Sequence, residues 1–200
     1  MEVLKTRRDL PKQSTAYLVD GQTFYNAMVS ICNQLPYVAL TGISNLQIAR
    51  DVPTIDCVSI NISASGADCS LAVYTGITPY QIKIYTKAQR IVFPEDCRRM
   101  FADNSLIPSS FPIFLSSNYT RCDFSRINNM SEMFANSHIS KIYVRGDIVF
   151  PQTAVSTDMF SGCTSLVGGS GTTYDANHTD GEYARIDNPP TAPGYFTAAT

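Results

Sequence analysis

The sequence has no tryptophan, only two histidines, and charged residues at no more than 16% of its length. Soluble domains carry about 25% charged residues, so we expect a surface that is polar but mostly uncharged. Lys and Arg number 15 against 17 Asp and Glu, which leaves no basic surface to hold a phosphate backbone. Nucleic acid is therefore not an expected partner. The shortage of histidine also removes the residue that most acid–base and metal sites use.

No apolar run reaches the roughly 18 residues that a membrane-spanning helix needs. The first twelve residues are rich in charge, and no apolar segment of signal-peptide length follows them. We therefore expect neither a membrane span nor an export signal. The six cysteines include no Cys-x-x-Cys motif, and their wide spacing suits neither a zinc site nor a dense disulfide framework. They are interpreted as small buried hydrophobic residues.

The first 88 residues predict a small α+β unit. Apolar residues recur at three- and four-residue steps over 23–35, which indicates an amphipathic helix of about three turns. Apolar and polar residues alternate over 58–63, which indicates a half-buried strand. Two further alternating segments, 70–74 and 81–85, flank a loop that contains Gly and Pro and predict a hairpin. No catalytic motif occurs in this unit.

From residue 91 onward the sequence repeats a short motif. Three Met-Phe pairs, which begin at Met100, Met133 and Met159, are each followed by a small or polar stretch and then an aliphatic residue. The first spacing between pairs is the longer one, and the segment 111–114 is interpreted as its extra residues. Such a period indicates stacked units, in which each Met-Phe pair packs between neighbouring coils. Matching apolar segments precede two of the pairs, at 91–94 and 148–151.

Two of these segments resemble a known family. Residues 129–134 read N-M-S-E-M-F and residues 158–166 read D-M-F-S-G-C-T-S-L, which is similar to the BspA-type leucine-rich repeats of Mycoplasma lipoproteins and gut-bacterial surface proteins. Residues 168–187 and 193–197 resemble the segment that closes these arrays. The resemblance covers about residues 90–197. It implies a short leucine-rich-repeat-like solenoid used for adhesion or protein–protein contact, with no catalytic residues and no cofactor.

The predicted fold class is therefore α+β, in three parts. A small N-terminal unit of one helix and antiparallel strands, which anchors or assembles the protein, spans 1–88. A leucine-rich-repeat-like solenoid of about three repeats spans 89–167, and a C-terminal cap and tail spans 168–200. The exposed strand face of the repeats is the predicted partner-binding surface, with Lys141, Tyr143 and Arg145 on it. Three tyrosines are predicted to cover the last coil or to form a contact patch: Tyr174, Tyr183 and Tyr195.

Enzymatic alternatives find little support in the sequence. Cys163 and His178 are the nearest Cys/His pair, but Cys163 falls at a packing position of the repeat, which favours a structural cysteine over a nucleophile. Residues 175–181 partly match a calcium loop, yet the glycine comes one position late and Ile186 stands where a bidentate Glu is needed. His138 has no carboxylate placed by sequence to orient it. We predict no catalytic residue, no metal site and no cofactor.

The predicted function is that of a non-enzymatic structural or interaction protein. Similar repeats occur in phages of gut bacteria, so a virion component made in the host cytoplasm is favoured, such as a capsid decoration, head fibre or tail adhesin. The alternative is a bacterial surface adhesin that binds host proteins or glycans. Expected partners are other virion or surface proteins, with a host-cell glycan or protein as a second class. A homo-oligomer is also expected, because particle sites are symmetric.

Overall fold

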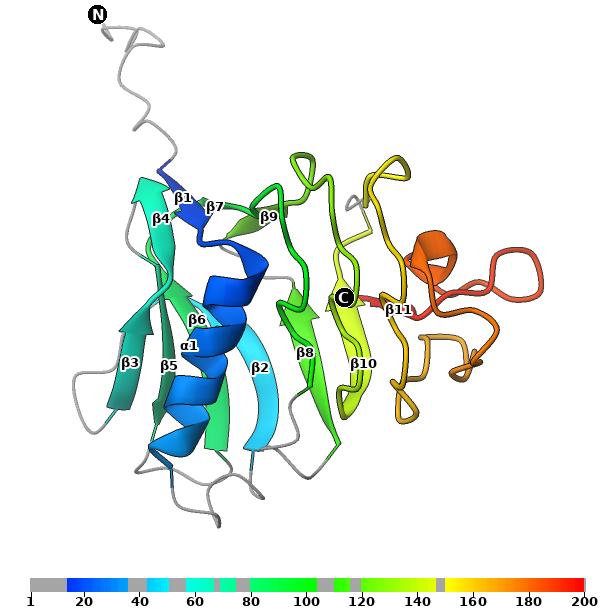
Figure 1. Cartoon of the computed structure of the whole chain (residues 1–200), viewed down its shortest axis with the longest axis horizontal. Coiled ribbons are helices and arrows are strands. Elements are labelled where there is room, and N and C mark those ends of the chain that lie inside the picture. The colour runs from blue at the N-terminus through cyan, green and yellow to red at the C-terminus, as the bar shows by residue number, and fades with distance from the viewer. Residues whose placement is uncertain are drawn as a thin grey trace, which may run out of the picture.

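The computed structural model describes residues 14–35, 43–50, 57–66, 69–74, 80–103, 110–115, 120–146 and 150–199. Within these ranges the chain forms one α-helix, α1 (Gly21–Asn33), one short 3-10 helix, η2 (Gly181–Tyr183), and a set of short strands (Figure 1). The strands are β1 (Thr15–Leu18), β2 (Ile43–Ala49), β3 (Cys57–Asn61), β4 (Ser63–Gly66), β5 (Cys69–Tyr74), β6 (Tyr80–Thr86), β7 (Arg90–Val92), β8 (Phe111–Leu115), β9 (Arg121–Asp123), β10 (Ile139–Val144) and β11 (Phe196–Ala198).

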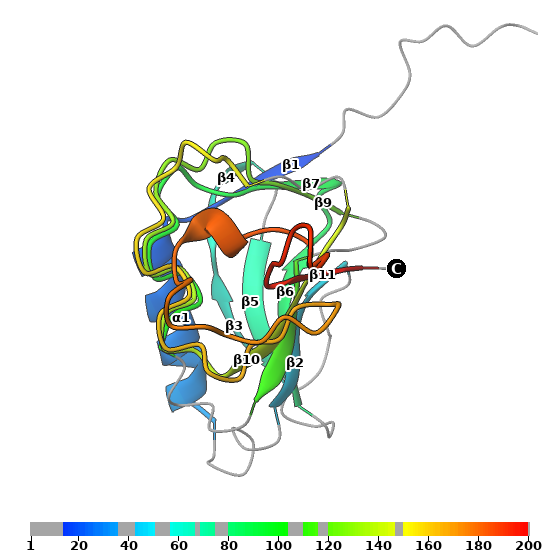
Figure 2. The same cartoon turned by 90° about the vertical axis from the view of Figure 1, so that its right-hand side faces the viewer.

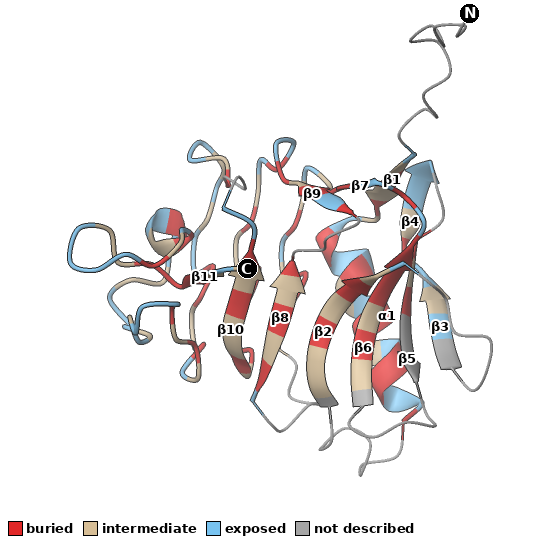
Figure 3. Cartoon of the chain, turned by 180° about the vertical axis from the view of Figure 1, so that it is seen from behind, coloured by how far each residue is buried: buried red, intermediate tan, exposed pale blue. Residues whose placement is uncertain are grey.

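The strands form two mixed sheets. The larger has seven strands in the order β11-β10-β8-β2-β6-β5-β3, and the smaller has four in the order β4-β1-β7-β9. Pairing is parallel from β11 to β6 and antiparallel from β6 through β5 to β3. In the smaller sheet β1 runs parallel to β7 and antiparallel to β4. Helix α1 covers one face of the larger sheet, and the opposite face carries no described helix or strand (Figure 3).

This architecture shows that the predicted fold class is wrong. The protein is mostly β structure in two mixed sheets, with one described α-helix, and is not a helix-plus-strand unit followed by a leucine-rich-repeat solenoid. Strands from before and after residue 88 share both sheets: β2 pairs with β8, and β1 pairs with β7. Alternation in a sequence reports which side of a strand is buried, but it does not report which strand lies alongside. For that reason the sequence suggested a boundary after residue 88, whereas strands on either side of this position pair with each other.

Several local predictions are confirmed. The helix predicted over 23–35 is α1, and Asp20 caps it by accepting a hydrogen bond from the Thr23 backbone N at 2.9 Å. The strand predicted over 58–63 corresponds to β3 as far as Asn61, although the chain then passes through Ile62 into β4 of the smaller sheet. The predicted hairpin is the antiparallel pair β5–β6. The assignment of 111–114 as extra residues is wrong, because these residues form β8, which pairs in parallel with β10.

The three Met-Phe pairs occupy turns that share one backbone conformation. In each turn the residue before Met and the third residue after Met have a left-handed φ, between 37° and 71°. Gly, Asn and Asp adopt this region more readily than other residues, and Gly162 (φ 71°) stands where an added Cβ would meet the Asn136 side chain. The left-handed residues are Arg99, Glu132 and Asp158 before Met, and Asp103, Asn136 and Gly162 after it.

Backbone hydrogen bonds hold the turns in register. The Phe101 N donates to the Met133 carbonyl at 2.8 Å, and the Phe134 N donates to the Met159 carbonyl at 2.9 Å. The Phe160 N continues the series by donating to Thr179 O in the C-terminal segment. Figure 2 shows the turns one behind another on the same side of the molecule as α1. Equivalent residues of successive turns therefore lie directly over each other.

The side chains in this register form two aromatic ladders in the core. In the first, Phe101, Phe134 and Phe160 stack with centroids 5.5 Å apart and nearly parallel rings. Phe24 of α1 meets one end of this ladder edge-on, and Tyr195 meets the other end edge-on. Each ring is at most 5% exposed, which confirms the predicted packing of the Met-Phe pairs. The second ladder consists of Phe93, Phe124, Phe150 and Phe196, with neighbouring centroids 4.3 to 5.1 Å apart.

Replacing the central ring of the first ladder tests how much the ladder stabilises the fold. We expect Phe134→Ala to lower the free energy of unfolding by about 3–5 kcal/mol, because it leaves a cavity between two buried rings. Urea denaturation measures this value. The matched control is Phe114→Ala, which removes a half-buried ring outside the core and should cost clearly less. An equal decrease in the free energy of unfolding for both variants would show that the ladder does not stabilise the fold more than a surface ring does.

Candidate functional site

The candidate site is the face of the seven-stranded sheet that points away from α1, here called the outer face. Alternate residues of the central strands are buried beneath it, while the residues between them are half-buried and point outward (Figure 3). The strand register aligns five outward residues in one line across five strands, here called the outer row. The outer row consists of Thr197, Tyr143, Phe114, Gln47 and Lys83.

An aromatic pair lies at the centre of the outer row. The rings of Phe114 on β8 and Tyr143 on β10 stack with centroids 4.5 Å apart and planes 4° from parallel. Gln47 lies beside Phe114 on β2 and donates a hydrogen bond from Nε2 to Gln81 Oε1 at 3.1 Å. Cross-strand aromatic pairs of this kind stabilise a sheet. The outer face therefore presents a stacked, half-exposed aromatic pair with polar neighbours.

The structure brings two of the three predicted contact residues to this face. Tyr143 belongs to the outer row, and Lys141 lies two residues before it on β10, with Nζ donating to the Gly168 carbonyl at 3.3 Å. Arg145 is exposed just beyond the end of β10. Sequence reasoning missed Phe114, Gln47 and Lys83, because their proximity to Tyr143 depends on strand pairing between distant segments. Alternation over 81–85 and 111–115 was the available signal that these residues point outward.

The C-terminal segment 168–199 covers the last Met-Phe turn and is organised by Asp187. The two side-chain oxygens of Asp187 accept hydrogen bonds from Ser170 N, Thr172 N, Thr172 Oγ1 and Gly194 N at 2.6 to 3.2 Å. Only 4% of Asp187 is exposed. Burial raises the pKa of this carboxyl, but the hydrogen bonds from Thr172, Gly194 and Ser170 outweigh burial and hold the pKa below its ordinary value. One ionised carboxylate thus ties together three separate parts of the segment.

The three predicted tyrosines all make packing contacts in this segment. Tyr195 is fully buried, and its hydroxyl accepts a hydrogen bond from Asp175 N at 3.0 Å. Burial raises the pKa of Tyr195 to about 12. Tyr174 is half-buried and accepts a hydrogen bond from Gly162 N, while half-buried Tyr183 packs against Tyr195 with centroids 4.9 Å apart. These are the contacts of a cap, and Tyr195 has no surface left for a partner.

The Cys/His pair considered as a nucleophile and base makes separate structural contacts. Cys163 is fully buried, its Sγ donates to the Phe134 carbonyl at 2.9 Å, and burial raises the pKa of its thiol. His178 stacks on Tyr183 with centroids 4.4 Å apart, and its Nδ1 lies 3.4 Å from Glu182 Oε1. All five cysteines whose side chains are described have buried, free thiols: Cys32, Cys69, Cys97, Cys122 and Cys163.

No metal centre emerges from the described part of the chain. It contains no group of three or more His, Cys, Asp or Glu side chains arranged to hold an ion. In the segment compared with a calcium loop, Asp175 Oδ1 accepts hydrogen bonds from the Asn177 backbone N and from Asn177 Nδ2, both at 2.9 Å. This arrangement is an Asx turn. His138 is half-buried and directly precedes β10.

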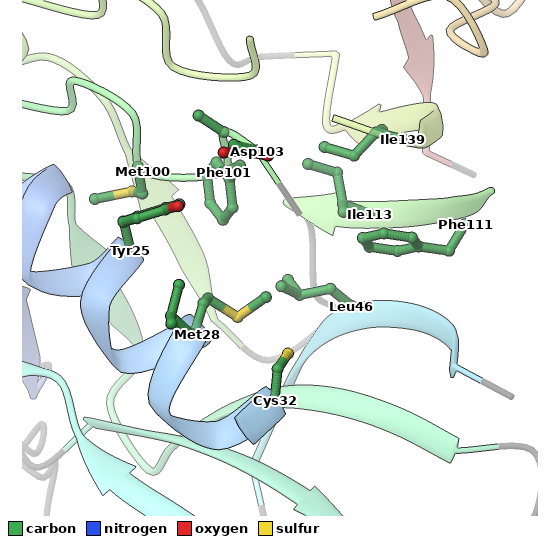
Figure 4. Close-up of a pocket in the computed structure, with 12 residues that line it drawn as sticks. Tyr25, Met28, Cys32, Leu46, Met100, Phe101, Asp103, Phe111, Ile113 and Ile139 are labelled. Atoms are coloured by element: carbon green, nitrogen blue, oxygen red, sulfur yellow. The ribbon is translucent and has the colours of Figure 1, made fainter. Parts of the chain in front are cut away.

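An apolar gap lies between α1 and the larger sheet. Figure 4 shows Met28 and Cys32 of α1 pointing toward Leu46 of β2, with Phe101 and Ile113 also at the gap. Its volume is about 20 Å³. This space holds about one water molecule, and its lining is almost entirely apolar. We interpret it as a small packing gap in the core, too small to bind an organic ligand.

No family model, no curated protein and no solved structure matches this chain. The resemblance to BspA-type repeats therefore stays a prediction. Among the described residues, no helix is long and apolar enough to cross a membrane.

Asp187→Asn tests the buried carboxylate of the C-terminal segment. An amide has one acceptor oxygen, so at least one buried donor loses its partner, and the free energy of unfolding should fall by about 2–3 kcal/mol at pH 7. Because the folded-state pKa lies below the unfolded value of about 3.9, ionised Asp187 stabilises the fold above pH 4, and this contribution disappears as the pH falls through the lower folded value.

The measurement is the melting temperature of both proteins between pH 2 and pH 7. The difference between wild type and Asp187→Asn should be largest at neutral pH and should shrink below pH 4. The matched control is Asp158→Asn, the same chemical change at an exposed carboxylate, which should follow the wild type throughout. A difference that stays constant down to pH 2 would contradict the role given to the Asp187 charge.

Proposed function

We propose that this protein is a non-enzymatic binding module that engages another protein through the outer face of its seven-stranded sheet. The observation that carries the proposal is the stacked pair Phe114–Tyr143, held half-exposed at the centre of the outer row. Aromatic residues are enriched in protein–protein interfaces, where a few of them supply most of the binding energy. Lys83 in the same row and Lys141 on β10 add positive charge around the pair.

Rigidity adds to this support. Phe114 and Tyr143 lie on adjacent strands of a continuous ladder, and each ring limits the motion of the other. A contact pair that is already ordered loses little side-chain entropy when a partner binds. The buried residues directly beneath, such as Ile113 and Ile142, belong to the main core. The proposed surface is thus supported from below by the main core.

A non-enzymatic role is also supported by how the reactive side chains are used. The thiol of Cys163, the carboxylate of Asp187 and the hydroxyl of Tyr195 each make hydrogen bonds within the stacked turns or the C-terminal segment. His178 packs on Tyr183. Each of these groups therefore contributes to packing or hydrogen bonding within the fold.

For the setting of this binding we propose a virion, with display on a bacterial surface as the alternative. The support comes from the sequence, since the repeated motif resembles repeats found in phages and in bacterial surface proteins. Co-purification with particles in fixed stoichiometry is the result expected for the first setting. Accessibility to protease on intact cells is the result expected for the second.

A photoreactive benzoylphenylalanine in place of Tyr143 tests the proposed surface. Irradiation of particles or cells that contain this variant should give a discrete adduct with a different protein, identified by mass spectrometry. Adding Phe114→Asp should reduce the adduct about tenfold or more, which corresponds to 1.4 kcal/mol or more of binding energy.

The control places the same photoreactive residue at Thr153, an exposed position in a turn outside the sheet. This variant should give no such adduct. Equal adducts from both positions, an adduct at 143 that Phe114→Asp leaves unchanged, or an adduct only with a second copy of the chain would each overturn the proposal.

A further inference from the structure

One continuous segment, residues 57–66, forms the end of both sheets. It consists of β3, the last strand of the larger sheet, and β4, the last strand of the smaller sheet, with only Ile62 between them. Both strands lie along one margin of the molecule in Figure 1. We call residues 57–66 the edge segment. At the opposite end of the larger sheet, the final strand β11 belongs to the C-terminal segment that closes the stack.

The edge segment lacks the features that protect most sheet edges. Its sequence, C-V-S-I-N-I-S-A-S-G, contains no charged residue and no proline. Natural proteins usually place charges, proline or a covering element at an exposed edge, because an open edge pairs with other chains. Here Ser59, Asn61 and Ala64 to Gly66 are exposed, and no described strand pairs with the outer side of β3.

The hydrogen-bond pattern shows which backbone groups face outward. Ile62 N donates to Cys69 O at 2.9 Å, and Asn61 lies opposite Ser70 in the antiparallel register of β3 with β5. In an antiparallel pair, residues alternate between those that bond to the neighbouring strand and those that point away from it. Ile60, like Ile62, therefore faces β5, while Ser59 and Asn61 direct their backbone N–H and C=O groups away from the sheet.

We propose that two copies of this chain pair through β3 in antiparallel orientation, with the two Ser59 residues opposite each other on a two-fold axis. This register places Cys57 of each copy opposite Asn61 of the other, so every outward backbone group of β3 finds a partner. The pairing joins two seven-stranded sheets into one continuous sheet. It also covers Ile60, which packs on the core but is only half-buried at the edge.

A second copy fits this edge better than a different protein because the edge is self-complementary. In a two-fold pair, a charged residue near the axis lies close to the same residue of the other copy. An uncharged strand therefore avoids the repulsion that a charged strand would meet. The outward side chains near the axis, Ser59 and Asn61, are small and polar and tolerate identical neighbours. The edge segment has no charge that would select a partner of opposite sign.

Two substitutions of Ser59 test the pairing in the purified full-length chain. Ser59→Lys places two like charges across the two-fold axis. Ser59→Pro removes an N–H that points away from β5, so it blocks the new pairing and leaves the β3–β5 ladder complete. Sedimentation equilibrium over a range of concentrations should show a dimer for the wild type and at least tenfold weaker dimerisation for each variant. The matched control, Thr153→Lys, should dimerise like the wild type.

Hydrogen exchange locates the contact. Amides of the edge segment should exchange more slowly in the wild type at high concentration than in Ser59→Lys, while amides of β10 should exchange alike in both. A wild type that stays monomeric at high micromolar concentration overturns the inference, and so does a dimer that both Ser59 variants leave intact. If Ser59→Pro unfolds, the dimerisation of Ser59→Lys and the hydrogen exchange of the edge-segment amides decide whether the pairing exists. Because only the purified chain is used, this outcome is independent of the partner proposed for the outer face.

Discussion

The rest of the structure depends on aromatic stacking between turns that hydrogen-bond to each other in register. A single turn cannot bury its phenylalanine, because one side of the ring would face water; the ring is covered only when another turn lies on each side. The backbone bonds from Phe101 to Met133 and from Phe134 to Met159 fix the spacing at which the rings meet. Side-chain packing and backbone pairing therefore stabilise the same arrangement.

The stack also explains the elements at its two ends. Each end would expose a phenylalanine ring unless another element covered it. Phe24 of α1 covers Phe101 at one end, and Tyr195 covers Phe160 at the other, in both cases edge-on. The ionised carboxylate of Asp187 then orders the segment that carries Tyr195, through hydrogen bonds to Ser170, Thr172 and Gly194. A buried charge is tolerated there because its oxygens are surrounded by donors.

Sequence reasoning succeeded where the signal was local. The helix α1, the strand β3, the hairpin β5–β6 and the burial of the Met-Phe pairs all follow from periodicity within a few residues. It failed where long-range pairing decides the structure. The contact of Leu46 with Ile113 across β2 and β8 merges the two halves of the chain into one sheet, and no local pattern reports it.

The same limit applies to the candidate site. Lys141 and Tyr143 were predicted on an exposed strand face, since alternation within β10 is visible in the sequence. Their neighbours Phe114 and Gln47 were not, because they join Tyr143 only through the register of three parallel strands. The role of Asp187 was also missed, because its donors come from two separate places in the chain, 170–172 and 194, which meet only in the folded segment.

The left-handed positions that the three Met-Phe turns share have a consequence for how such a chain can change over time. Because the middle turn has a similar turn hydrogen-bonded to it on each side, a duplicated turn could enter the middle of the stack while α1 and the C-terminal segment keep their contacts. Gain or loss of one unit would lengthen or shorten the outer face by about one strand spacing, roughly 4.8 Å. A change in the number of Met-Phe units would therefore change the length of the molecule without requiring a new core.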